Sequence, residues 1–127
     1  MVPRGAEAYR KTEAQSRSPM ELVVMLYDGA LRFVGQAQAS SSDKRARSRA
    51  VSRAIAIVSE LQNTLNVNDG GDVAADLDRL YSYLNARLLD VTMKGDTDAL
   101  EEVRKVLVTL RDGWSQAASN AGSARKP

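Results

Sequence analysis

The chain has 127 residues, of which 43% are hydrophobic and 27% charged, and its formal net charge is +2. This length and composition fit one compact domain with a hydrophobic core and exclude a disordered chain. The absence of cysteine and histidine excludes disulfides, thiolate nucleophiles, histidine bases and a zinc site built from nitrogen and sulfur ligands. We therefore expect no cofactor and no metal site.

Residues 1–17 lack a sustained hydrophobic period, and residues 1–5 resemble the remnant of a protease site from an expression vector. No basic segment leads into an apolar run long enough for a signal peptide. The longest apolar run, residues 22–27, is far too short to span a bilayer. We therefore expect a cytoplasmic protein without membrane insertion.

A first helix is predicted over residues 19–39, with Ser18 as N-cap, Pro19 at the first helical position and Glu21 closing a capping box. Its apolar residues fall on two sides. One stripe contains Leu22, Leu26, Gly29, Ala30, Phe33 and Ala37, while Val24, Tyr27 and Leu31 lie toward the opposite side. Such a helix either lies at the centre of a bundle or keeps an apolar surface for a partner.

Three serines, residues 40–42, connect this helix to a second one, whose N-cap is Asp43. The second helix ends in a turn-rich loop, residues 66–71, after which Asp72 caps a third helix. Lys94 and Gly95 end the third helix, and Asp96 caps a fourth. The expected core faces contain Ala46, Ala50, Ala54, Ile57, Val58, Leu61 and Leu65, then Val73, Leu77, Leu80, Tyr81, Leu84, Leu88 and Val91, and finally Ala99, Val103, Leu107, Leu110, Trp114 and Ala117.

Four helices joined by short loops, without an alternating strand pattern, predict an all-α fold, an antiparallel up-and-down four-helix bundle. The bundle is expected over residues 18–118. Residues 1–17 form an N-terminal segment that can pack on it, and residues 119–127 are small, polar and basic and are expected to be a flexible tail.

Several apolar residues remain after the core faces are assigned. A third-helix strip of Ala75, Ala86, Leu89 and Met93 lies opposite the core face, and Tyr83 flanks it. A contiguous apolar strip is typical of a site for a partner helix, although single exposed apolar residues are normal on soluble proteins. For Ile55 and Val108, which lie alone, ordinary exposure is the favoured interpretation, whereas for the strip both interpretations stay open.

Short strings of residues complete the pattern: Ala8-Tyr9, Ser18-Pro19, Met25-Leu26-Tyr27-Asp28-Gly29-Ala30, Gly70-Gly71, Leu80-Tyr81-Ser82-Tyr83-Leu84-Asn85-Ala86-Arg87-Leu88 and Leu110-Arg111-Asp112-Gly113-Trp114. In order and spacing they resemble the family of the flagellar export chaperone FliS, and the resemblance extends from about residue 6 to residue 118. The string from Met25 to Ala30 is the most specific, whereas Ser-Pro or Gly-Gly alone carries little weight.

The resemblance implies a cytosolic flagellar secretion chaperone that binds the disordered C-terminal region of flagellin, prevents its premature polymerisation and assists type III export without catalysing a reaction. It also implies contact with export-gate components, and it leaves open a co-chaperone or flagellar regulator and a homodimer of the unliganded protein. The predicted flagellin-binding residues are Tyr9, Tyr27, Leu31, Ile55, Tyr83, Asn85, Ala86, Leu89 and Met93. Tyr9 is either a displaceable cap on the groove or a simple anchor of the N-terminal segment.

Two alternatives belong to other classes of protein. A basic cluster, Lys44, Arg45, Arg47, Arg49 and Arg53, begins the second helix and could serve a helical nucleic-acid-binding or regulatory adaptor protein. Because no aromatic residues are interleaved, a solvated face is the favoured interpretation and no nucleic acid is expected. An all-helical enzyme would need inward charges, but Arg79, Arg87, Arg104 and Arg111 fall outside or at the margin of the apolar stripes.

Overall fold

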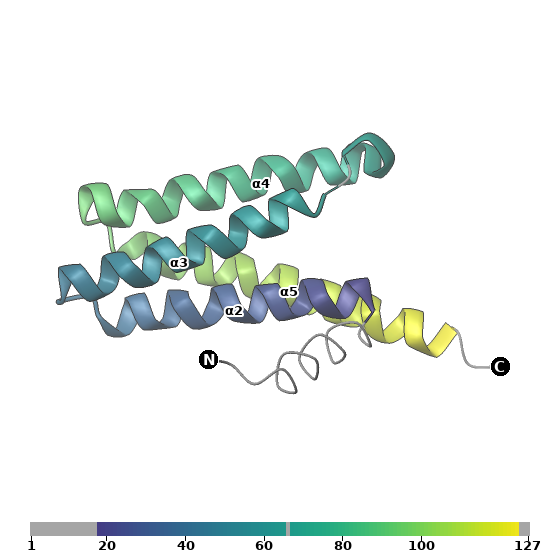
Figure 1. Cartoon of the computed structure of the whole chain (residues 1–127), viewed down its shortest axis with the longest axis horizontal. Coiled ribbons are helices and arrows are strands. Elements are labelled where there is room, and N and C mark those ends of the chain that lie inside the picture. Colours follow the sequence, from purple (N-terminus) through teal and green to yellow (C-terminus); the bar gives the residue numbers. More distant parts are fainter. Residues whose placement is uncertain (1–17, 66, 125–127) are drawn as a thin grey trace, which may run out of the picture.

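The computed structural model describes residues 18–65 and 67–124, without the side chains of residues 67–69 and 121–124. It contains four helices, α2 (Pro19–Ala39), α3 (Lys44–Asn63), α4 (Val67–Lys94) and α5 (Asp98–Ala124). Within the described ranges there is no strand. The predicted all-α four-helix bundle is therefore confirmed (Figure 1).

Each helix packs against two others, so that the four enclose a single core. The helices α2 and α4 do not face each other directly, and each contacts both α3 and α5. The α2–α3 and α4–α5 turns lie at one end of the bundle, whereas the start of α2 and the α3–α4 connection lie at the other (Figure 1). These two ends differ in chemistry, as described below.

The predicted starts of the first two helices are confirmed. The backbone N–H of Glu21 donates to the Ser18 hydroxyl at 3.1 Å, and the N–H of Ala46 donates to the Asp43 carboxylate at 3.2 Å. Each bond satisfies one of the amide donors that the first turn of a helix leaves without an intrahelical partner. The bounds of α2 also match the prediction from its sequence.

The starts of the last two helices differ from the prediction. One helical turn from Val67 precedes Gly71, where φ is 58° and ψ is −136° and the helix kinks. Glycine tolerates this positive φ because it has no Cβ, so the expected loop is partly helical. The helix α5 begins at Asp98, and the carboxylate of Asp96, the expected N-cap, instead accepts a bond from Arg87 at 3.2 Å. At its other end α5 continues to Ala124, past residue 118.

The core face of α2 shares Gly29, Ala30 and Ala37 with the predicted stripe but also includes Tyr27 and Val34. Its buried residues are Tyr27, Gly29, Ala30, Val34 and Ala37, whereas Leu22 is 37% exposed. The physical reason is that α2 packs against both α3 and α5, so the helix is covered on two sides. Gly29 permits the close approach of α3, since a Cβ there would lie 3.1 Å from Ile57 Cδ1.

The other three helices follow the predicted faces more closely. Their buried side chains are Ala50, Val51, Ala54, Val58 and Leu61 on α3, Ala74, Tyr81, Leu84, Leu88 and Val91 on α4, and Ala99, Leu100, Val103 and Leu107 on α5. One expectation is wrong, because Val73 was assigned to the core of the third helix and is 70% exposed. Its position follows the kink at Gly71, where the chain has just turned into the helix.

Candidate functional site

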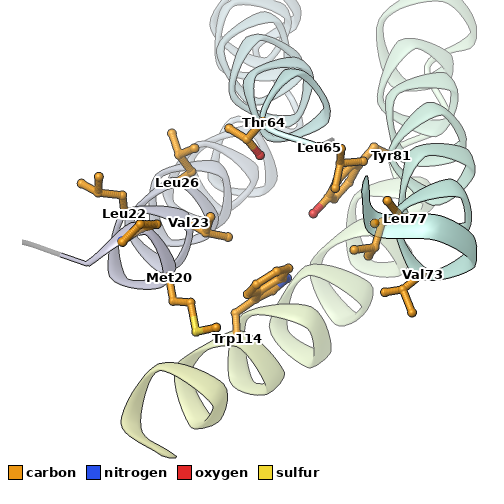
Figure 2. A pocket seen from close by; sticks show the side chains of 13 residues that line it. Met20, Leu22, Val23, Leu26, Thr64, Leu65, Val73, Leu77, Tyr81 and Trp114 are labelled. Atoms are coloured by element: carbon orange, nitrogen blue, oxygen red, sulfur yellow. The ribbon is translucent and has the colours of Figure 1, made fainter. Parts of the chain in front are cut away.

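An apolar hollow of about 620 Å³ opens at the end of the bundle where α2 begins. We use the name apolar hollow for the space between Leu22, Val23 and Leu26 of α2, Val73 and Leu77 of α4, and Trp114 of α5. In Figure 2, Met20 and Val23 lie on one side, Leu77 and Val73 on the other, and Trp114 between them. The volume lies within the range of about 300–1,000 Å³ typical of ligand pockets.

The local sequence explains why the hollow opens at this end. The Ser18 cap and Pro19 start α2 at its rim, so the first apolar residues of α2 line the hollow. On the opposite wall the kink at Gly71 begins the continuous part of α4, which leaves Val73 exposed. Thus apolar side chains that the helical period directs inward stay in contact with solvent.

Two tyrosines form a polar pair beside this hollow. Tyr27 and Tyr81 are 0% and 1% exposed, their hydroxyls share a hydrogen bond, and their ring centroids lie 6.4 Å apart. Burial raises the pKa of both hydroxyls above the ordinary value of 10.0, so both are neutral at physiological pH. Tyr81 also lines the hollow, and its hydroxyl points inward in Figure 2.

This pair corrects one predicted site residue. Tyr27 was expected on a flagellin-binding surface, but it is fully buried. Its ring was assigned to the outer side because Tyr27 lies off the predicted stripe, whereas the buried face of α2 is wider than that stripe and includes Tyr27. A buried hydroxyl needs a hydrogen-bond partner, and Tyr81 supplies one from across the core. We therefore assign Tyr27 to the core.

The third-helix strip lies on the outer face of α4 for most of its length. Leu89 is 51% exposed and Met93 73%. Ala86 is exposed as well, whereas Ala75 is half-buried. Tyr83 flanks the strip with 47% exposure, and its hydroxyl donates to Glu102 of α5 at 2.7 Å.

The remaining predicted residues do not join this surface. Leu31 and Ile55 are partly buried and pack against the core, because α2 and α3 each have two neighbouring helices. Asn85 is half-buried, and its side-chain amide donates to Ser59 of α3 at 3.1 Å, which ties α4 to α3. Tyr9 lies outside the described residues. The predicted set therefore contains one exposed group, on α4, and several residues that belong to the bundle itself.

An ionic network fixes the α4–α5 turn near the strip. Arg87 donates to Glu102 at 3.0 Å, to Asp90 at 2.9 Å and to Asp96 at 3.2 Å. The three hydrogen bonds raise the pKa of Arg87, and the bond to Glu102 contributes most. The pKa of the Glu102 carboxyl is lowered, mainly by the hydrogen bond from Tyr83 and then by the bond from Arg87. The network therefore links the part of α4 that carries the strip to α5 and to the turn between them.

The charges needed for an all-helical enzyme are not inside the bundle. Among residues 18–65 and 70–120, whose side chains are described, no charged residue is buried. Arg104 pairs with Glu101 at 2.6 Å and Arg111 with Asp28 at 2.8 Å, both near the surface. The described residues also contain no group of acidic side chains suited to a metal ion. No described helix is both long enough and apolar enough to cross a bilayer.

The sequence did not predict the apolar hollow. Its walls include Leu22, Leu26, Val73 and Leu77, all of which were assigned to core stripes. The adjacent glycines 70 and 71 could have indicated a kink at the start of the third helix, since glycine is the residue that adopts positive φ. The pattern alone carries no sign that the neighbouring helices leave this end uncovered.

Comparison with known proteins supplies a second line of observation. The family model described as flagellar protein FliS matches residues 3–121. The flagellar secretion chaperone FliS of Salmonella typhimurium is 33% identical over 124 residues, which cover 92% of this chain and 92% of that protein. The flagellar secretion chaperone FliS of Bacillus subtilis is 36% identical, and the match covers 87% of this chain and 83% of that protein. The FliS of Campylobacter jejuni is 35% identical, and the match covers 89% of this chain and 90% of that protein.

Proposed function

The chain belongs to the family of the flagellar protein FliS, and we propose that it is a cytoplasmic flagellar secretion chaperone for flagellin. It binds the disordered C-terminal region of flagellin, prevents premature polymerisation and assists type III export. Its relatives are flagellar secretion chaperones, which supports the assignment to flagellar secretion. The apolar hollow carries the proposal for this chain, because within the described residues it leaves a large apolar surface uncovered beside the buried core.

The energetics of capturing an unfolded segment favour such a surface. Ordering a disordered segment on binding costs about 2–5 kcal/mol or more. Burying one leucine or valine side chain contributes about 1.5–3 kcal/mol. Several apolar anchors are therefore needed, and side chains from three helices line the hollow to receive them. Covering the apolar face of the cargo also removes the surface through which its copies would associate.

The third-helix strip offers a second contact for the same segment. An amphipathic helix docks on an apolar surface through residues spaced three and four apart, which is the spacing of Ala86, Leu89 and Met93. We place flagellin on the hollow and on this strip, with Tyr83 at its edge. Leu31 and Ile55 support this surface from within the bundle, and Asn85 holds the position of α4 through Ser59.

Tyr9 and the rest of residues 1–17 are proposed as a displaceable cap of the hollow. The chain enters α2 at Ser18, and Pro19 lines the rim of the hollow, so the preceding segment starts beside it. Export-gate components are further proposed partners, with a co-chaperone or flagellar regulator as an additional one. In the unliganded protein the same apolar surface could join two copies as a homodimer.

Calorimetric titration with a peptide from the C-terminal region of flagellin of the same organism tests the proposal. We expect one peptide per chain and a negative heat-capacity change, because apolar surface is buried. Leu22→Asp or Val73→Asp should weaken binding about tenfold or more, since each places a charge in the hollow. Leu89→Asp and Met93→Asp test the strip in the same way.

Met25→Asp is the matched control. Met25 is 48% exposed on α2 but does not line the hollow, so this variant should bind like the unaltered chain. Circular dichroism must show that every variant keeps its helices. Binding that all four hollow and strip variants leave unchanged would contradict the proposed site. Deleting residues 1–15 should strengthen binding or leave it unchanged, and weaker binding by a folded protein would contradict the cap.

A further inference from the structure

The segment from Arg32 to Arg53 concentrates positive charge. It contains the six cations Arg32, Lys44, Arg45, Arg47, Arg49 and Arg53, with Asp43 as its single carboxylate. Asp43 is occupied as the N-cap of α3. Within the described part of the chain, none of these six cations has an ion-pair partner, whereas five of the six on α4 and α5 are paired.

The arrangement of these cations works against the helix that carries them. Arg45, Arg49 and Arg53 follow one another at a spacing of four and therefore share one face of α3, where like charges repel. Lys44 and Arg45 begin the helix, where its dipole disfavours positive charge. Two of the cations on α3 make contacts within the fold: the Arg47 guanidinium donates to the main-chain oxygen of Ser41 at 2.5 Å, and the Arg53 guanidinium lies over the ring of Phe33. Neither contact neutralises a positive charge.

A shallow concavity lies next to these charges. A hollow of about 350 Å³ separates the end of α2 from the start of α3. We call it the basic groove, and it is lined by Gln36 and Ala39 on α2 and by Ala46, Arg49 and Arg53 on α3. The small alanines leave room for apolar side chains of an occupant, while the two arginines at the groove supply unpaired positive charge.

The surroundings of the groove indicate which class of macromolecule fits it. The ring of Phe33 has the guanidinium carbons of Arg32 and Arg53 at 6.0 and 5.7 Å from its centroid. The ring is therefore already covered by cations and is not a free platform on which bases could stack. The large exposed hydrophobic residues of the described chain all lie elsewhere, so this face lacks side chains that could insert into a lipid surface.

We propose that the basic groove binds an acidic polypeptide segment of a partner protein, whose carboxylates pair with Arg49 and Arg53 and whose small apolar side chains lie against Ala39 and Ala46. The groove lies at the end of the bundle that holds the α2–α3 turn, and the apolar hollow lies at the other end (Figure 1). The two sites can therefore be occupied together. The proposal does not depend on the flagellin-binding assignment.

Fluorescence anisotropy of the full chain with a defined probe tests it. The probe is a labelled peptide of glutamate and alanine, and a second peptide carries glutamine in place of each glutamate. The glutamate peptide should bind, and salt should weaken its binding, because the contact is electrostatic. Arg49→Glu combined with Arg53→Glu should weaken binding about tenfold or more.

The matched control is Arg79→Glu combined with Lys105→Glu. It changes the net charge by the same amount, at exposed cations outside the groove, and should alter binding by less than about twofold. Arg49→Gln with Arg53→Gln provides the same test without charge reversal, should the glutamate variant not fold. A single-stranded oligonucleotide and vesicles containing phosphatidylserine serve as the competing probes.

Three results would overturn the proposal. One is equal weakening in the groove and control variants, which would show a general attraction between opposite charges. Another is equal binding of the glutamate and glutamine peptides, or no binding of either. The last is tighter binding of the oligonucleotide or the vesicles than of the glutamate peptide at the same salt concentration.

Discussion

The two ends of this bundle differ in how completely they are closed. At the end with the α2–α3 and α4–α5 turns, Val34, Val51, Val91 and Leu100 are all at most 1% exposed. At the opposite end Leu61 is buried, but Leu22 is 37% exposed and Val73 70%. Val73 and Val91 lie on the same helix, so the difference comes from their neighbours and not from their residue type.

Short turns and polar contacts between helices hold the closed end. Two short turns connect the helices there, Asp43 caps α3, and Arg87 ties the end of α4 to Asp96 and Glu102. Gln38 of α2 also donates to Glu101 of α5 at 2.9 Å. On α2 and α3 the closed end therefore presents charge to a partner, whereas the open end presents the apolar hollow. This comparison teaches that one small bundle can offer two binding chemistries on separate surfaces, with the exposed Leu89 and Met93 of α4 on a further face.

The largest expected effect comes from two leucines near the starts of their helices. Leu100 lies 1% exposed at the closed end, and Leu22 lies 37% exposed at the open end. Leu100→Ala should lower the free energy of unfolding by about 2–5 kcal/mol, because it leaves a cavity. Leu22→Ala should lower it by less than about 1 kcal/mol. Urea unfolding followed by circular dichroism measures the free energy of unfolding of both variants. Equal losses would contradict the difference in burial between the two ends.

A smaller effect is expected for the tyrosine pair beside the hollow. Tyr27→Phe or Tyr81→Phe leaves the other buried hydroxyl without its partner and should lower the free energy of unfolding by about 1–3 kcal/mol. The double variant should lose less than the sum of the single variants, because no unpaired hydroxyl remains. Tyr83→Phe is the control, since Tyr83 is exposed, and should change stability by less than about 0.5 kcal/mol. If the double variant lost as much stability as the two single variants together, the hydrogen bond between the two hydroxyls would not contribute to stability.

The same pair gives a pH dependence of known sign. The folded state holds the pKa of Tyr27 and Tyr81 above the unfolded value of 10.0, mainly through burial. Their contribution to stability is therefore complete below pH 10.0 and is lost as the pH rises beyond it. Urea midpoints measured at increasing alkaline pH should fall less steeply in the double variant than in the unaltered chain. An identical slope would show that these hydroxyls ionise normally.

The smallest expected effect has the opposite sign and concerns the closed end. Arg49→Gln removes two repulsive pairs, one with Arg45 and one with Arg53, and each pair costs about 0.2–0.5 kcal/mol. The variant should therefore raise the free energy of unfolding by about 0.4–1 kcal/mol. Arg104→Gln is the contrasting variant and should lower stability, because Arg104 pairs with Glu101 at 2.6 Å. Both differences should shrink at high salt. A loss of stability in Arg49→Gln would show that the fold uses this charge.

Much of the bundle could be predicted because its signals are local. Ser18 and Asp43 bond to amides three residues ahead, so their positions start α2 and α3 whatever the rest of the chain does. The same holds for the exposure of Leu89 and Met93, since helical period places them opposite Leu84, Leu88 and Val91. The use of that exposed strip for flagellin stays a prediction.

The candidate sites depend on contacts between helices, which the hydrophobic period of a single helix cannot predict. Tyr27 was placed on a surface, although a partner 54 residues away in the sequence, Tyr81, holds its hydroxyl in the core. Several residues that line the apolar hollow, among them Leu22, Leu26, Val73 and Leu77, were expected to be buried. The basic cluster was visible as a run of charge, but its concavity required the alanines of two helices to meet.

The sequence by itself determined that this chain forms four helices, where the first two begin, and which residues of α3 and α4 face inward over most of their length. It could do so because caps and helical period act over a few neighbouring residues. Only the tertiary structure decided where those inward faces are covered. Leu22 and Val73 have the same spacing as their buried counterparts, and they remain exposed because none of the described helices reaches over them at the open end.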